Sequence, residues 1–290
     1  MNENRQKETD KKVFNFTVQG ASHIKKNKIC QDNSFSFSDG KNHIIVVCDG
    51  HGGDNYFRSD KGSLYACRSA YECITEFLTC AEEFNQGNAK RKNEMIEQLE
   101  KSIISQWNEK VHNDVEQYPF SDEEMMPVSD KMKALYMSGE KIESAYGTTL
   151  IVVVATENFW LGIQLGDGKC VVMQEDNSFI QPIPWNDKCF LNETTSMCDF
   201  DAFNNFRYYY SEVMPVAIYI GSDGIDDCFG DDSELYSLYG IISKSFSETE
   251  FEQAKEELAE YLPRLSEKGS GDDMSIAAII DIKKLKEIIE

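Results

Sequence analysis

Short apolar runs alternate along the chain with longer segments of helical pattern. The runs FNFTVQG from Phe14, NSFSFSD from Asn33 and HIIVVCDG from His43 predict strands, and Asp39-Gly40 is a turn signal between the last two. The two segments that follow, roughly 57–84 and 93–117, repeat apolar residues every three or four positions and predict helices. Residues 118–141 are acidic and contain two prolines, so we expect an irregular connection with room for a short helix.

The second half of the chain returns to strands and then to helices. Apolar runs predict strands within 147–156, 159–175, 215–224 and 275–282, and helical patterns cover 231–245 and 247–268. Residues 175–212 are polar and aromatic without a clear period, and a segment of that length is usually functional or mobile. Residues 1–12 predict a disordered tail, and 283–290 a short charged tail. This order favours one α+β domain over residues 13–290 with largely antiparallel sheets.

Composition narrows the classes of partner and compartment. The 51 acidic and 29 basic residues give a formal net charge of −22. Such a surface repels nucleic-acid phosphates and anionic lipid headgroups, so neither is expected as a partner. The nine cysteines are dispersed and include no C-x-x-C pair, which indicates free thiols in a reducing compartment. The N-terminal residues lack an apolar signal, and no run reaches the roughly 18 apolar residues of a membrane span. We therefore expect a soluble cytoplasmic protein, with a monomer as the default.

Aspartates stand beside five of the apolar runs. Asp49, Asp167 and Asp223 follow strands directly and precede glycine, Asp272 opens the last strand, and Asp32 precedes an earlier one. Any single Asp-Gly is most simply a turn. Together, these residues place carboxylates at the rim of a buried sheet, where like charges repel one another unless a cation neutralises them. Oxygen-only ligands favour Mg²⁺ or Mn²⁺.

These residues form a set of motifs that resembles a known family. The motifs are DGHGG at 49–53, GTT at 147–149, GDG at 166–168, SDGID at 222–226 and GDDMS at 271–275, preceded by GASH…CQD at 20–32. In order and approximate spacing they resemble the PPM family, the metal-dependent serine/threonine protein phosphatases of the 2C type. The opening motif has the form found in some bacterial members. The resemblance spans roughly residues 16–282.

The resemblance implies a fold and a metal centre. The fold would be a central sandwich of two antiparallel β-sheets flanked by α-helices, in four layers (α-β-β-α), with a variable flap near 175–212. At one end Asp49 would bridge two Mg²⁺ or Mn²⁺ ions, with the Gly50 carbonyl binding one of them. Asp223 and Asp272 would complete the other site, and Asp32 would act through metal-bound water. Asp167 matches the position that, with Asp223, holds a weaker third metal in some members.

The chemistry expected of such a site is hydrolysis of phosphoserine and phosphothreonine in proteins. A water bridging two metals has a sharply lowered pKa, so hydroxide is available near neutral pH to attack phosphorus in line. His51 is the candidate that protonates the leaving alkoxide; the alternative is a turn residue that hydrogen-bonds a metal ligand. His23 is expected to support the site without acting in catalysis, and Thr148 and Thr149 to pack beneath the sheet.

One position departs from the family pattern. The family usually places a phosphate-binding Arg five residues before the Asp that matches Asp32, and Asn27 stands there, flanked by Lys25, Lys26 and Lys28. Either a lysine binds the phosphate or the metals hold it alone. Partners expected are a phosphorylated protein and, as a further candidate, a cognate Ser/Thr kinase. The alternative function is a catalytically weak or inactive PPM-like module that binds metal or a regulatory partner.

Overall fold

The computed structural model describes residues 10–189 and 193–289, and these contain two antiparallel sheets of five strands each. One sheet has the order β1-β10-β9-β6-β7 and the other the order β2-β3-β4-β5-β8. The strands of the first sheet are β1 (Lys11–Val18), β10 (Met274–Asp281), β9 (Ala217–Gly221), β6 (Lys169–Met173) and β7 (Phe179–Ile180). Those of the second are β2 (Asn33–Ser38), β3 (His43–Cys48), β4 (Leu150–Ala155), β5 (Trp160–Leu165) and β8 (Arg207–Ser211).

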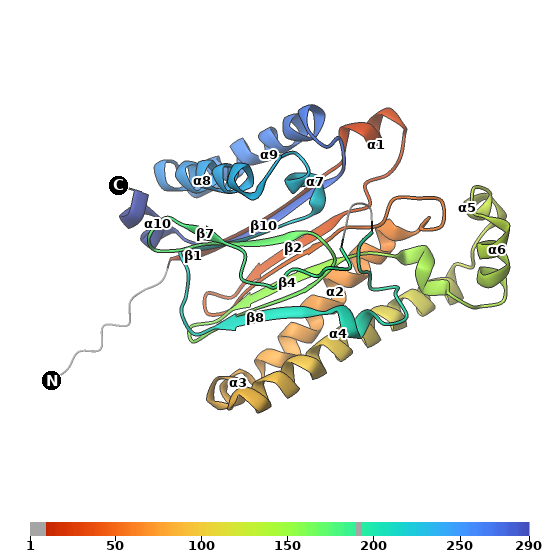
Figure 1. Cartoon of the computed structure of the whole chain (residues 1–290), viewed down its shortest axis with the longest axis horizontal. Coiled ribbons are helices and arrows are strands. Elements are labelled where there is room, and N and C mark those ends of the chain that lie inside the picture. The colour runs from red at the N-terminus through yellow and green to blue at the C-terminus, as the bar shows by residue number, and fades with distance from the viewer. Residues whose placement is uncertain (1–9, 190–192, 290) are drawn as a thin grey trace.

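Helices cover the outer face of each sheet (Figure 1). The second sheet is covered by α2 (Ser59–Leu78) and α4 (Ala89–Gln117), with α3 (Ala81–Gln86) between them in sequence. The first sheet is covered by α8 (Asp232–Glu248) and α9 (Phe251–Lys268), with α10 (Ile282–Ile289) beside them. Shorter helices connect these elements: α1 (Ala21–Lys25), α5 (Asp122–Met125), α6 (Asp130–Met137), α7 (Asp223–Asp226) and the 3₁₀ helices η1 (Ile142–Tyr146) and η2 (Ala202–Asn205).

Three apolar layers hold the four structural layers together. The central strands β3 and β4 are buried along their whole length, so their side chains face helices on one side and the other sheet on the opposite side. Ile44, for example, packs toward α2 and α4, whereas its neighbour Ile45 lies between the sheets. A third layer joins the first sheet to α8 and α9. This is the four-layer sandwich that the sequence predicted.

Three segments differ from the prediction. Residues 118–141 contain two helices, α5 and α6, which project at one end of the molecule (Figure 1). The supposedly charged tail from residue 283 is helix α10, whose Ile282 and Leu285 are buried against the first sheet's apolar layer. Within 175–212, Arg207–Ser211 forms strand β8, which pairs with β5 at the edge of the second sheet. The predicted tail at 1–12 lies outside the described residues up to residue 9, and Lys11 begins β1.

Within the described residues, the helices are all too short or too polar to cross a lipid bilayer.

Candidate active site

A cleft of about 1010 Å³ opens where the ends of the two sheets meet. Every residue that the sequence singled out for the metal centre lines it: Asp32, Asp49, Gly50, Asp167, Asp223 and Asp272, together with His51. These residues come from five separate segments of the chain, so only the fold brings them together. The structure thus brings the predicted carboxylates together in one cleft.

The 147–149 turn fixes the Asp49 turn. The Asp49 N–H donates to Thr149 Oγ1 at 3.1 Å, and the Asp49 carbonyl accepts from Thr148 Oγ1 and from the Thr149 N–H, both at 2.8 Å. The His51 N–H donates to the Gly147 carbonyl at 3.0 Å. The two threonines are buried, as expected, and they bond the backbone of the predicted bridging ligand.

The carboxyl groups crowd one another at the centre of the cleft. The Asp49 and Asp223 carboxyls lie close enough to affect each other's pKa. Burial, followed by the charges of Asp223 and Asp32, raises the pKa of Asp49 well above its ordinary value. Burial likewise raises the pKa of Asp223 to about 6. Without a cation, the carboxyls of this cluster therefore stay protonated at pH values where free carboxyls are ionised.

Asp32 provides a direct test of whether the cluster fits a cation. Its side chain is buried and hydrogen-bonds Ser222 and Ser275. Its second oxygen, Oδ2, is buried and has no hydrogen-bond partner among the residues that the structure describes. A buried carboxylate oxygen left without a donor is costly. A divalent cation or its water would satisfy it, so the residues present fit the hard-metal centre that the motifs predict.

Asp273 has a different role from its neighbour Asp272. Its two oxygens accept the backbone N–H groups of Gly20 (2.6 Å) and Gln31 (2.7 Å). The side chain thereby ties the chain on both sides of α1 to the start of β10. Asp272 is exposed to the cleft, with its side chain 56% accessible, and is free to meet a ligand. The buried His23 touches both aspartates, at 3.4 Å from Asp272 and 3.0 Å from Asp273, which agrees with a supporting role.

His51 points into the cleft beside Tyr56, whose ring meets it edge-on at 5.0 Å between centroids. Burial lowers the pKa of His51 to about 4, so the imidazole is mostly neutral at neutral pH in the protein without a ligand.

Few positively charged side chains lie at the end of the cleft where the sequence led us to expect phosphate binding. Asn27 and the lysines around it are exposed and do not belong to the described cleft wall. Of the described residues that line the cleft, Lys188 alone carries a permanent positive charge, and its Nζ pairs with Asp201 at 2.9 Å. This arrangement favours the second alternative left open by the sequence, in which metals hold the phosphate.

Sequence reasoning missed several acidic residues of the cleft. Asp227 follows Asp223 by four residues. The helical spacing of SDGIDD could therefore have placed both side chains on the same face of a helix, toward the cleft. The segment 175–212 supplies a further wall with Asp187, Glu193, Asp199 and Asp201. It is tied to the Asp167 turn because the Gly166 N–H donates to Thr195 Oγ1 at 3.0 Å. No local pattern in this polar segment indicates that contact.

A model of the protein phosphatase 2C family matches residues 19–263 of the chain. The chain belongs to this family. The solved structures similar to it include bacterial phosphatases of the same type, at identities that show the fold alone. PppA, described as a key regulatory component of T6SS in Pseudomonas aeruginosa, has 16% identity and a TM-score of 0.58, with 93% of this chain and 97% of that chain covered. No curated protein sequence matches the chain.

Two further solved structures are similar to the chain over most of their length. The catalytic domain of the serine/threonine protein phosphatase PstP, solved with two manganese ions, has 13% identity and a TM-score of 0.55, with 93% of this chain and 99% of that chain covered. The serine/threonine phosphatase Stp1 from Staphylococcus aureus has 14% identity and a TM-score of 0.55, with 94% of each chain covered.

Proposed function

We propose that this 2C-family chain hydrolyses phosphoserine and phosphothreonine in proteins and depends on Mg²⁺ or Mn²⁺. The observation that carries the proposal is the meeting of Asp49, Asp223 and Asp272 with His51 in one cleft. Two divalent cations bound there would supply activated water and neutralise the charge of the phosphoryl group. The PstP structure with two manganese ions supports the same number here.

The chain's own residues divide the work. Asp49, the Gly50 carbonyl, Asp223 and Asp272 would hold the cations, and Asp32 would orient water beside them. Asp167, with Asp223, would hold a third and weaker cation. His51 donates a proton to the leaving oxygen. Because burial lowers the pKa of His51 to about 4, its imidazole takes up that proton beside the negative charge of the bound phosphoryl group.

The proposal is tested by hydrolysis of p-nitrophenyl phosphate and of a phosphothreonine peptide with and without Mn²⁺. We expect Mn²⁺-dependent turnover of both substrates. Asp223→Asn should lower kcat by about a hundredfold or more, because it removes a metal carboxylate. Asp130→Asn is the matched control, since Asp130 is an exposed residue at the start of α6, and it should leave kcat unchanged.

Two results would contradict the proposal in different ways. If Asp223→Asn turns over at the wild-type rate, the assignment of the metal ligands is wrong. If the wild-type protein binds Mn²⁺ but hydrolyses neither substrate, the chain is the inactive metal- or partner-binding module that the sequence left as its alternative.

A further inference from the structure

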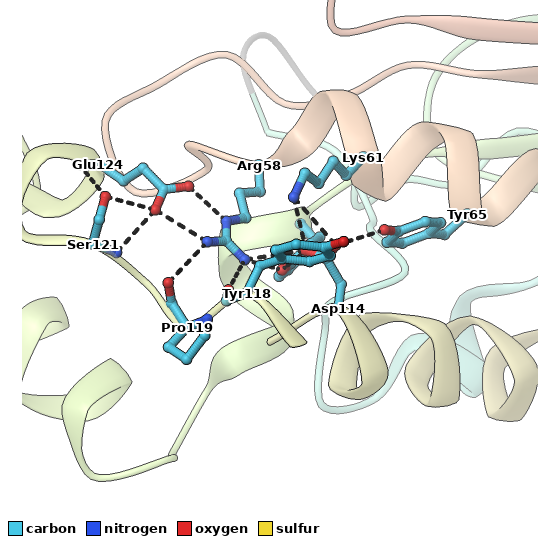
Figure 2. Close-up of polar contacts among 9 residues, drawn as sticks. Arg58, Lys61, Tyr65, Asp114, Tyr118, Pro119, Ser121 and Glu124 are labelled. Carbon is cyan, nitrogen blue, oxygen red and sulfur yellow. Dashed lines mark hydrogen bonds and ion pairs between the residues drawn. The ribbon is translucent and has the colours of Figure 1, made fainter. Parts of the chain in front are cut away.

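Arg58 is a buried cation just before α2, and its guanidinium joins three segments of the chain (Figure 2). Its Nε and Nη2 donate to the two oxygens of Glu124 at 2.7 and 3.0 Å. Its Nη1 donates to Asp114 Oδ2 at 3.1 Å and to the Tyr118 carbonyl at 2.8 Å. Arg58 therefore links the start of α2 to the end of α4 and to α5.

Asp114 is the second centre of this network. Its carboxylate accepts from Lys61 Nζ at 3.0 Å, from Tyr65 Oη at 2.9 Å and from Tyr146 Oη at 2.6 Å. Burial opposes the charge, but the hydrogen bonds from Tyr146, Lys61 and Tyr65 outweigh it, and the pKa of Asp114 lies below its ordinary value. Arg58 Nη1 also lies 2.8 Å from Tyr146 Oη, so this hydroxyl contacts both buried charges.

A network of buried charges is not the most stabilising way to fill this space. Charges taken out of water gain little stability even when paired, and apolar side chains of similar volume often replace them without loss. What paired charges do provide is a fixed geometry, because a planar guanidinium and a carboxylate accept only a few arrangements. A role in fixing nearby backbone is therefore worth seeking.

The network adjoins both groups that hold the backbone of His51. On one side, Tyr146 is followed by Gly147, whose carbonyl accepts the His51 N–H at 3.0 Å. On the other side, Arg58 is followed by Ser59, whose hydroxyl accepts from Gln31 Nε2. The same Gln31 nitrogen donates to the His51 carbonyl at 2.9 Å.

The packing between these groups leaves little room for adjustment. A Cβ added at Gly147 would lie 2.6 Å from His51 Cδ2. A Cβ added at Gly62, one turn into α2, would lie 1.8 Å from the Tyr146 carbonyl oxygen. The backbone N–H of Arg58 also donates to the Ala145 carbonyl at 2.9 Å. A shift of Tyr146 would therefore be passed to His51 through Gly147.

We propose that Arg58, Asp114 and Tyr146 are positioning residues that fix the backbone of His51 and so direct its imidazole toward the leaving oxygen of the substrate. This inference rests on the proposed function of His51. It assigns a catalytic consequence to a network that touches neither the substrate nor the metal ligands.

The test compares two tyrosines that donate to the same carboxylate. Tyr146→Phe and Tyr65→Phe each remove one hydroxyl from Asp114, but only Tyr146 precedes the residue that binds His51. The readout is kcat on two substrates of different leaving groups. A threonine alkoxide needs a proton as it leaves, whereas p-nitrophenolate is stable without one. His51→Gln sets the full size of this leaving-group effect.

We expect Tyr146→Phe to lower kcat on the phosphothreonine peptide by about tenfold and kcat on p-nitrophenyl phosphate by less than about twofold. Arg58→Lys, which keeps the charge but loses the planar fork, should show the same split. Tyr65→Phe should show neither loss. A general loss of folded protein would lower both rates together. Equal losses on both substrates, or equal behaviour of the two tyrosine variants, would overturn the inference.

A second readout does not depend on activity. A ¹H–¹³C NMR spectrum resolves the ring signals of the four histidines. The signals that disappear in His51→Gln belong to His51. Tyr146→Phe should shift or broaden these signals, and Tyr65→Phe should leave them in place. If the wild-type protein is inactive, the proposed function fails, and the NMR comparison still decides the positioning role. Unchanged His51 signals in Tyr146→Phe and Arg58→Lys would refute it.

Discussion

At the scale of single residues, Glu100 is a buried carboxyl that does not line the candidate active site. It is only 4% exposed on α4, and its Oε1 has no hydrogen-bond partner in the part of the chain that the structure describes. Burial, and then the charge of Glu97, raises its pKa from 4.5 to about 7. A folded-state pKa above the unfolded one means that ionisation costs stability: the cost is absent below about pH 4.5 and complete above about pH 7.

Glu100→Gln should therefore stabilise the protein at alkaline pH. We expect a gain of at most about 3 kcal/mol in the free energy of unfolding at about pH 8, and little difference at about pH 4.5. Urea denaturation at both pH values measures this. Glu109→Gln, an exposed change on the same helix, is the control and should alter stability by less than about 0.5 kcal/mol at either pH. An equal gain for Glu100→Gln at both pH values would show that ionisation is not the cause.

Single residues also show where the sequence was sufficient and where it was not. Asp49 and Asp223 could be placed in advance because each ends a continuous apolar strand, and strand ends meet at the rim of a sheet. The roles of Asp273 and Arg58 could not, because they depend on contacts with residues far away in sequence. Asn27 illustrates the same limit: counting positions placed it at the phosphate, and the turn after α1 points it to solvent.

At the scale of elements, helix α2 is positioned by a close contact with η1. Gly62 lies inside the helix, where alanine would ordinarily be favoured by about 1 kcal/mol. Its missing Cβ would lie 1.8 Å from a backbone oxygen, and backbone cannot give way as a side chain can. The steric clash of the added Cβ should therefore outweigh the higher helix propensity of alanine.

We expect Gly62→Ala to lower the free energy of unfolding by about 2 kcal/mol or more, as judged by chemical denaturation. Gly240→Ala in α8 is the matched control. The nearest atom to its added Cβ would be 3.9 Å away, in ordinary contact, so that helix should gain about 0.5–1 kcal/mol. A gain of the same size in Gly62→Ala would mean that α2 and η1 can separate freely.

Elements were predicted well where apolar runs were long. Strands β3, β4 and β9 are buried along their whole length and read as continuous apolar sequence. Strand β8 was missed because RYYYS at a sheet edge is only partly buried and shows no alternation of apolar and polar residues. Helix α10 was missed because its lysines outnumber its buried residues, although it has the amphipathic pattern of a helix that covers a sheet.

At the scale of the whole molecule, eleven of the 51 acidic residues line one cleft. The sheets deliver carboxylates to a common rim, and the pKa values of Asp49, Asp32 and Asp223 are all raised there, first by burial. The fold therefore maintains a destabilising cluster at the point where its two halves meet. A ligand that neutralises this cluster should stabilise the entire molecule, because it binds the folded chain and not the separated segments.

Mn²⁺ should accordingly raise the melting temperature, whether or not the protein is active. At a free concentration about 100 times the Kd, binding adds about 2.7 kcal/mol, which corresponds to a shift of roughly 4–5 °C for a chain of this length. Asp223→Asn should lose most of the shift, and Asp130→Asn should keep it. Chelation should reverse the shift in the wild-type protein. An equal shift in wild type and Asp223→Asn would place the cation elsewhere on this acidic surface, since mass action stabilises a protein only through the site that is occupied.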